Sequence, residues 1–300
     1  MDGIININKP SGMTSFSVVA KIRHLSHEKK VGHSGTLDPL ATGVLPVYLG
    51  QATRIIEYVT DITKTYRAEI EFGKTTTTFD AEGEIVSQTN AASLTLEILR
   101  TVTGKFIGEI SQIPPAFSAV KQNGTPLYRL ARAGEEVRPQ ARKIRIEKID
   151  ILDWNPPIAT IEVDCTKGTY IRSLAHDLGQ ETGYGAYLKS LVRIRSGAFN
   201  LADAVTLDEL NAAFNSGNYA KFIHPIDHVL ADLPKADVDA ATAASIKNGI
   251  CITLPDIPTE KCCRVYDAER VFTAILKYDS ETSLWHPDKV FHMLDTANSM

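Results

Sequence analysis

The sequence predicts an α+β protein whose main sheet is mixed and largely antiparallel, with flanking helices and a small β-rich module at the C-terminus. Strand-like segments do not alternate regularly with long helical ones, which disfavours a doubly wound parallel sheet. A length of 300 residues is long for one domain and comfortable for two. At residues 224–236 two prolines and scattered polar residues indicate a linker. We therefore expect domains at residues 1–230 and 234–300.

Local patterns predict the helices and strands in order. Ser15 can cap a helix running to about Leu25. Residues 66–72 alternate apolar and charged side chains, which is typical of a half-buried strand. The other expected elements of the first domain are a short helix opened by Thr125-Pro126 and closed by Gly134, strands at 144–151 and 158–165, and a helix at 170–178 stopped by Gly179. In the C-terminal module we expect a helix at 238–248 and strands at 250–254, 263–266 and 271–278.

Charge is unevenly distributed along the chain. The formal net charge of −4 argues weakly against nucleic-acid binding, because such domains are usually basic. Residues 231–300 alone carry a net −4, so residues 1–230 are neutral. Within them, residues 121–149 hold eight basic and three acidic side chains. The net charge of the whole chain therefore hides a local basic stretch.

Cysteine spacing and hydropathy point to a reducing compartment. The four cysteines form no C-x-x-C pair, and the adjacent Cys262 and Cys263 are poor partners for one metal ion. The N-terminal residues lack the charged and apolar regions of a secretory signal, and no apolar run has the length of a membrane span. We expect a cytoplasmic protein with no metal site and no membrane association.

The most unusual segment is the loop at residues 32–43, G-H-S-G-T-L-D-P-L-A-T-G. Its glycines, proline and hydroxyl residues exclude a long regular element, and loops on rigid scaffolds often carry catalytic groups. Asp38 precedes Pro39, so its backbone is restricted towards extended conformations. From residue types alone, Asp38 could equally cap the turn, and His33 could be an ordinary loop histidine. No dinucleotide, P-loop, zinc-protease or nucleophile-elbow motif is present, and we expect no cofactor.

Several blocks together resemble the TruB family of bacterial tRNA pseudouridine-55 synthases. The first two are N-K-P-S-G-M-T-S at residues 8–15 and the loop at residues 32–43. Four further blocks follow in the family's order: K-T-Y-R at 64–67, Q-I-P-P-A-F-S-A-V-K at 112–121, K-G-T-Y-I-R-S-L at 167–174 and L-K-S-L-V-R-I-R-S-G at 188–197. The resemblance covers about residues 3–200 and implies a pseudouridine-synthase-like fold.

The resemblance implies a reaction and the residues that carry it. Uridine at tRNA position 55 would be isomerised, with Asp38 as the nucleophile or electrostatic support at the sugar, as carboxylates act in glycosidases. Arg172 would pair with Asp38 and lower its pKa. Tyr66 would stack on the flipped base and is a candidate for removing the proton from C5. Without the resemblance, Arg172 would be taken as a surface helix residue and Tyr66 as ordinary core.

The same resemblance implies substrate and RNA contacts. His33, Tyr170 and Leu191 match positions that line the substrate pocket. Flipping the target uridine costs a few kcal/mol, which RNA contacts have to offset. The candidate contacts are Asp80, Lys121, Arg129, Arg132, Arg142, Lys143, Arg193 and Arg195, although each basic side chain could instead be an ordinary solvated one.

Two positions depart from the family pattern. Thr77 replaces an aspartate of the block that ends at Asp80, and Tyr187 stands where a histidine is common. The tail from about residue 234 fits a PUA-like module in size, but it is acidic. We expect a monomer that acts on the T-stem-loop of tRNA. The alternatives are an RNA-binding or tRNA-folding protein and a related synthase acting on another RNA.

Overall fold

The computed structural model describes residues 1–59, 62–118, 120–122, 124–135, 137, 139–259 and 262–292, without the side chains of residues 121, 126, 128 and 132. The predicted contacts Lys121 and Arg132 therefore lie outside the described side chains. Within the described residues, no helix is long and apolar enough to cross a membrane.

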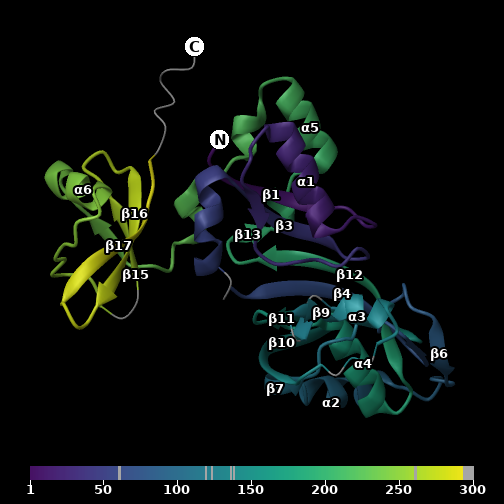
Figure 1. The fold of residues 1–300 in the computed structure, drawn as a ribbon. Helices are drawn as coiled ribbons and strands as arrows, with labels where there is room; N and C mark the ends of the chain where they lie inside the picture. The colour runs from purple at the N-terminus through teal and green to yellow at the C-terminus, as the bar shows by residue number, and fades with distance from the viewer. Residues whose placement is uncertain are drawn as a thin grey trace.

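A nine-stranded mixed sheet forms the centre of the described part of the chain, in the order β1-β3-β12-β4-β11-β10-β7 with β2 and β13 at its side (Figure 1). Its pairings are antiparallel except for that of β12 with β3, which is parallel. The predicted fold class is confirmed. The strands are β1 (Gly3–Lys9), β2 (Val31–His33), β3 (Thr42–Leu49), β4 (Lys64–Phe72), β7 (Gly108–Gln112), β10 (Arg142–Asn155), β11 (Ile158–Cys165), β12 (Ala186–Ser196) and β13 (Phe199–Asn200).

Helices pack against this sheet and enclose its main core. Figure 1 shows α1 and α5 together near β1, and α2 and α4 together at the other end of the sheet, where α2 packs on β10 and α4 on β12. Two short hairpins lie outside the sheet, and 3-10 turns connect several elements. The helices are α1 (Ser15–Ser26), α2 (Leu96–Gly104), α3 (Leu127–Arg132), α4 (Ile171–Thr182) and α5 (Leu207–Asn215); the hairpins are β5 (Lys74–Thr76) with β6 (Ile85–Gln88) and β8 (Lys121–Gln122) with β9 (Thr125–Pro126); the 3-10 turns are η1 (Gly50–Tyr58), η2 (Leu201–Asp203), η3 (Tyr219–Phe222) and η4 (Ile226–Val229).

Two predicted helix ends are wrong. The α1 cap is Thr14, whose side chain accepts a hydrogen bond from the Ser17 amide, because Ser15 is already helical. Helix α4 continues past Gly179 to Gly183, which has the positive φ of 79° expected of a glycine C-cap. Gly179 serves packing instead, since a Cβ there would lie 2.1 Å from the Ala186 amide nitrogen of β12. The absence of a side chain lets α4 lie directly on the sheet.

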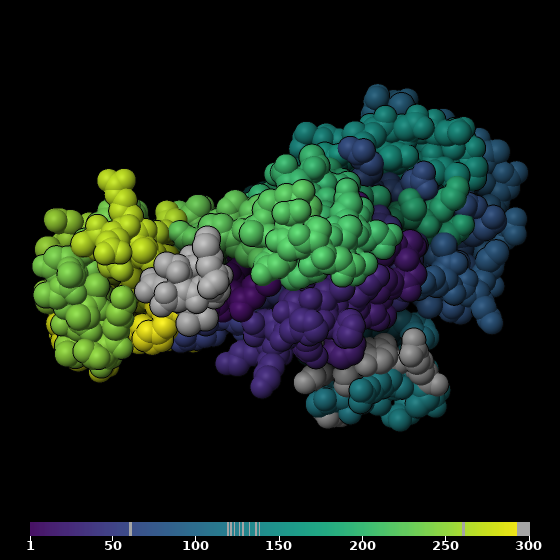
Figure 2. Space-filling view, turned by 90° about the horizontal axis from the view of Figure 1, so that it is seen from above, coloured from purple at the N-terminus to yellow at the C-terminus, as the bar shows by residue number. Residues whose placement is uncertain are grey.

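A second, four-stranded sheet in the order β14-β15-β16-β17 lies at one end of the molecule, and Figure 2 shows these residues in yellow and green at the left. The predicted strands at 263–266 and 271–278 are confirmed within a residue. The predicted strand at 250–254 is wrong, since only an isolated bridge joins Ile252 to Trp285. Strand β17 escaped prediction because Pro287 interrupts it, which an edge strand tolerates. The elements are β14 (Lys235–Asp237), α6 (Ala240–Lys247), β15 (Cys262–Tyr266), β16 (Phe272–Asp279) and β17 (Leu284–Val290).

The segment between the two sheets is packed rather than extended. Ile226 and Leu230 are buried in a cluster that also contains Val44 of β3 and Phe272 of β16. The predicted linker therefore connects the two sheets through a shared apolar core.

Candidate active site

The loop that carries Asp38 runs from β2 to β3 and is held on both sides by the N-terminal block. The buried Ser15 hydroxyl donates to the Leu37 carbonyl at 3.1 Å and accepts from the Leu37 amide at 2.8 Å. The Gly12 amide donates to the Pro39 carbonyl at 2.8 Å. Because both neighbours of Asp38 are fixed, its carboxylate is presented at a defined position.

Lys9 is a second anchor of this loop, and residue-type reasoning gave it no role. Its side chain is buried, and Nζ donates to the carbonyls of Pro10 at 2.9 Å and Pro39 at 3.3 Å, as well as to that of Met13. Burial lowers the pKa of Lys9 to about 8, and the Asp38 charge opposes this effect. Only the N-K-P block of the family resemblance could have drawn attention to it.

The structure brings Asp38 and Arg172 together. Asp38 Oδ2 lies 2.9 Å from Arg172 Nε, with 35% of the Asp38 side chain and 5% of the Arg172 side chain exposed. Arg172 Nη1 lies 3.3 Å from Asp80 Oδ2, and Nη2 donates to the Phe117 carbonyl at 2.9 Å. Three segments of the chain therefore hold one guanidinium in a fixed plane.

Asp80 was predicted to contact RNA, and its position contradicts that prediction. It is 2% exposed and forms the far side of the Asp38–Arg172–Asp80 network. The Thr76 hydroxyl donates to the Asp80 carbonyl at 2.7 Å, and the Glu82 amide donates to its carboxylate at 3.0 Å. A buried carboxylate needs a cation, and Arg172 supplies it.

The pKa of Asp38 is raised, against the expectation that Arg172 would lower it. Burial is the largest cause, and the Asp80 charge raises it further. Arg172 and Lys9 favour the ionised form but do not outweigh burial. Arg172 lowers the pKa as expected, but burial and the Asp80 charge outweigh it, so the net direction of the expectation was wrong.

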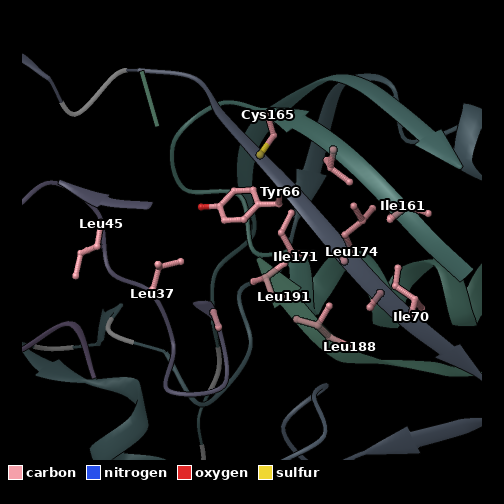
Figure 3. Close-up of a cluster of buried hydrophobic side chains, with 14 of the residues drawn as sticks. Leu37, Leu45, Tyr66, Ile70, Ile161, Cys165, Ile171, Leu174, Leu188 and Leu191 are labelled. Carbon is pink, nitrogen blue, oxygen red and sulfur yellow. The ribbon is translucent and has the colours of Figure 1, made fainter. Parts of the chain in front are cut away.

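A cavity of about 370 Å³ opens beside Asp38 and is lined in part by Tyr66, Tyr170 and Leu191. Tyr66 lies on β4, is 7% exposed and belongs to the main core cluster, so it is both core and cavity wall. Figure 3 shows its ring at the end of that cluster, with the hydroxyl pointing towards the loop of Leu37. Tyr170 stands just before α4, where its backbone is held by the Gln112 side chain at 2.8 and 3.0 Å.

Arg193 was predicted as a surface RNA contact but is fully buried in the cavity wall. Its Nε donates to the Val44 carbonyl at 2.7 Å and Nη2 to the Gly35 carbonyl at 3.1 Å. Nη1 is buried and has no partner in normal hydrogen-bond geometry among the described residues. Burial raises the pKa of Tyr66, and the charge of Arg193 together with a hydrogen bond to its side chain partly offsets this.

His33 does not line the cavity. It lies on β2, half-buried, and burial together with the Arg193 charge lowers its pKa. Its Nδ1 is buried without a hydrogen-bond partner among the described residues. His33 therefore lies next to the cavity-lining residue Arg193 but outside the cavity lining.

The remaining predicted RNA contacts lie outside the cavity. Arg129 and Lys143 are exposed, and Lys143 Nζ pairs with Glu109 at 3.0 Å. Arg142 is half-buried at the start of β10, and Arg195 pairs with Asp164 at 3.2 Å. Of the two departures from the family pattern, the Tyr187 hydroxyl donates to Glu71 at 2.6 Å, and the Thr77 hydroxyl accepts from the Glu84 amide at 3.1 Å.

Potential metal ligands do not cluster in the described chain. No group of three histidine, cysteine, aspartate or glutamate side chains is placed there to hold an ion. The cavity is lined by the Asp38 carboxylate, the buried guanidinium groups of Arg172 and Arg193, the lysines Lys64 and Lys167, and the aromatic rings of Tyr66 and Tyr170.

Comparisons with known proteins agree on one relationship. The family model of the TruB family pseudouridylate synthase N-terminal domain matches residues 23–171, and that of the tRNA pseudouridylate synthase B C-terminal domain matches residues 172–231. The chain is 46% identical to tRNA pseudouridine synthase B of Dehalococcoides mccartyi strain 195 over 97% of both chains. It is 44% identical to the Pseudomonas fluorescens Pf0-1 protein of that name over 92% of this chain and 91% of the relative.

Solved structures give the same picture of the fold. A Cbf5–Nop10–Gar1 complex matches with a TM-score of 0.76 and 28% identity over 97% of this chain and 85% of that chain. An H/ACA RNP bound to a substrate RNA containing 2′-deoxyuridine matches with a TM-score of 0.75 and 26% identity over 98% and 86%.

Proposed function

The chain belongs to the TruB family of pseudouridylate synthases, and from this premise we propose that it isomerises a uridine of tRNA to pseudouridine in the cavity beside Asp38. We assign the target to uridine 55 in the T-stem-loop. The observation that carries the proposal is the Asp38–Arg172 pair at 2.9 Å at the edge of a cavity of about 370 Å³. That volume lies within the range of roughly 300–1,000 Å³ typical of small-ligand pockets.

Asp38 acts at the sugar of the flipped uridine. The bond between C1′ and N1 breaks, the uracil turns, and a new bond joins C1′ to C5, while the C5 proton is lost and N1 gains one. No electron leaves or enters the substrate, so the reaction needs no redox partner. The Asp38 carboxylate attacks or supports the electron-poor C1′, as a glycosidase carboxylate does. Arg172 holds Oδ2, so the direction of the carboxylate is set before substrate arrives.

Tyr66 and Leu191 hold the base. Both line the cavity and both are 7% exposed, which leaves one surface of each for contact with a planar ring. Stacking of a base on an aromatic side chain contributes about 1–3 kcal/mol. Burial raises the pKa of Tyr66, so its phenol is neutral at physiological pH. We therefore assign it to stacking on the base.

Arg193 binds the uracil through Nη1. The Val44 and Gly35 carbonyls accept from Nε and Nη2, while Nη1 is buried with no acceptor in normal hydrogen-bond geometry and Tyr66 is the neighbouring side chain. An unpaired buried donor is costly, and a uracil carbonyl oxygen would satisfy it with a charge-assisted hydrogen bond. The donor is fixed in place, so it can orient the base as it turns.

Contacts outside the cavity offset the cost of flipping the uridine. The exposed Arg129 of α3 and Lys143 of β10, with the half-buried Arg142 next to Lys143, are candidate phosphate contacts. We propose that residues 1–230 are the catalytic domain and residues 234–300 a PUA-like module. The acidic charge of the module limits its contact with phosphates. We place the active protein in the cytoplasm as a monomer.

Release of tritium from tRNA labelled at C5 of uridine tests the proposal. Asp38→Asn should abolish release and leave tRNA affinity largely intact, and the exposed Asp203→Asn is the matched control. Full activity of Asp38→Asn would contradict the assignment. Mapping pseudouridine in the product distinguishes position 55 from other sites, and release from another RNA but not from a T-stem-loop would favour a related synthase. Binding of tRNA without release by the unmodified protein would favour a binding or folding function.

A further inference from the structure

A second group of nucleophilic and basic side chains lies on the four-stranded sheet, away from Asp38. Ile252 and Trp285 exchange two backbone hydrogen bonds of 3.0 and 2.8 Å. The neighbouring residues Cys251 and His286 therefore lie opposite each other as a non-hydrogen-bonded pair. In such a pair the side chains lie closer together than in a hydrogen-bonded pair. Trp285 points into the core, so Cys251 and His286 lie on the opposite face.

The imidazole of His286 is held between a thiol and a carboxylate. Cys251 Sγ lies 3.2 Å from Nδ1. On the other side, Nε2 lies 3.2 Å from Thr282 Oγ1 and 3.5 Å from Asp279 Oδ2. Thr282 donates its own proton to Asp279 at 2.9 Å, so its oxygen accepts from Nε2–H. This assigns the ring proton to Nε2 and leaves the lone pair of Nδ1 facing the thiol.

The thiol is accessible from an open hollow of about 420 Å³ between α6 and the bridge at Ile252. Cys251 is partly exposed, and the hydroxyl residues Thr242, Ser245 and Thr253 line the same hollow. A nucleophile, a base and a group that orients the base are the elements that activate cysteine in enzymes. The hollow adds room for a small polar substituent on the sulfur.

We propose that Cys251 is a modification site that undergoes thiol–disulfide exchange with a small polar disulfide. The thiol proton passes to His286 Nδ1, and the sulfur attacks one sulfur of the disulfide R–S–S–R. The S–S bond of the reagent breaks, a new Cys251–S–S–R bond forms, and R–S⁻ leaves and takes the proton from His286. Cys251 is oxidised and the leaving thiol is reduced, so the electrons balance within the exchange.

The other three cysteines serve as internal controls. Burial raises the pKa of Cys165 to about 11 and that of Cys263 to about 12. Cys262 is partly exposed like Cys251, but burial raises its pKa as well. Thiolate is the reacting form, so these three residues should react slowly.

The experiment exposes the full-length protein to oxidised glutathione at about pH 7 and follows each cysteine by peptide mass spectrometry. Cys251 should form the mixed disulfide about tenfold or more faster than Cys262. His286→Gln should bring its rate down to that of Cys262, whereas His24→Gln, at an exposed histidine of α1, should not change it. Thr282→Val, on an exposed turn, should also slow the exchange, because the hydroxyl that accepts from His286 Nε2–H is lost and the ring proton can then move to Nδ1.

Equal rates at Cys251 and Cys262 in the unmodified protein would overturn the proposal. An unchanged rate in both His286→Gln and Thr282→Val would overturn the role of the imidazole. Continued protection of Cys165 and Cys263 from the reagent reports that each variant is folded, so that a loss of reactivity is not mistaken for unfolding.

Discussion

Asp80 offers the sharpest test of how the buried network controls Asp38. In Asp80→Asn the side chain keeps its size and one oxygen that can accept from Arg172, but it loses its charge. Because the Asp80 charge raises the pKa of Asp38, its removal should lower that pKa. The acidic limb of the pH profile of kcat/KM should therefore move to lower pH, since the ionised carboxylate is the active form.

The rate on the plateau should fall modestly. The ion pair between Arg172 Nη1 and Asp80 at 3.3 Å becomes a hydrogen bond between a charged and a neutral group. Hydrogen bonds to charged groups contribute about 1.5–3 kcal/mol, so we expect a loss of roughly 1 kcal/mol when one of the two charges is removed. This corresponds to about a fivefold loss in kcat if it appears fully in the transition state.

The assay is tritium release in single turnover from about pH 5 to about pH 9, with tRNA affinity measured in parallel. Glu84→Gln, at an exposed carboxylate of the same loop, controls for a change in overall charge. An acidic limb that stays in place or moves upward would refute the reasoning. So would a loss that falls on tRNA affinity alone, because Asp80 would then be an RNA contact after all.

Three further changes test other parts of the structure. Arg193→Met should lower kcat/KM on tRNA by at least about tenfold, because a charge-assisted contact to the base is lost; an unchanged value would exclude the proposed uracil contact. Ser15→Ala should destabilise the fold by about 2–4 kcal/mol in urea denaturation, because the Leu37 amide and carbonyl lose their buried partner; Ser17→Ala, on the exposed side of α1, should cost much less. Burial raises the pKa of Asp177 from 3.8 to about 6. The free energy of unfolding should therefore fall as pH rises from about 4 to about 6, because the unfolded chain ionises first. Asp177→Asn should then be more stable than the unmodified protein at pH 8, by at most about 3 kcal/mol and by less after screening, with no difference remaining below about pH 4; equal stability at both pH values would contradict the shift.

Local patterns predicted part of the fold and part of the site, although the strands β1, β3 and β12 were not predicted. Alternation predicted β4 and β11, because one face of each strand is buried and the other is not. The glycine- and proline-rich loop around Asp38 stood out because few sequences of that composition form regular elements. Family blocks added Arg172 and Leu191. These features are local in the chain, so a single sequence can reveal them.

Burial of charged residues could not be predicted in the same way. Arg193, Asp80 and Lys9 belong to residue types that are almost always exposed, and sequence reasoning placed the first two on the surface. Each is buried because segments distant in the sequence supply partners: Arg193 donates to the carbonyl of Val44, 149 residues earlier, and Asp80 pairs with Arg172 of α4. The direction of the Asp38 pKa shift was wrong for the same reason, since it depends on the balance of burial against shared charges.

The sequence by itself determined the family, the strands β4, β10, β11, β15 and β16 and the carboxylate at the centre of the site, because these follow from motifs and from side-chain periodicity. Tertiary structure alone decided which charges are buried, which residues border the cavity and how Arg172 is divided between two carboxylates. The physical reason is that burial and electrostatic coupling arise from contacts between segments far apart in the chain, and no local pattern records them.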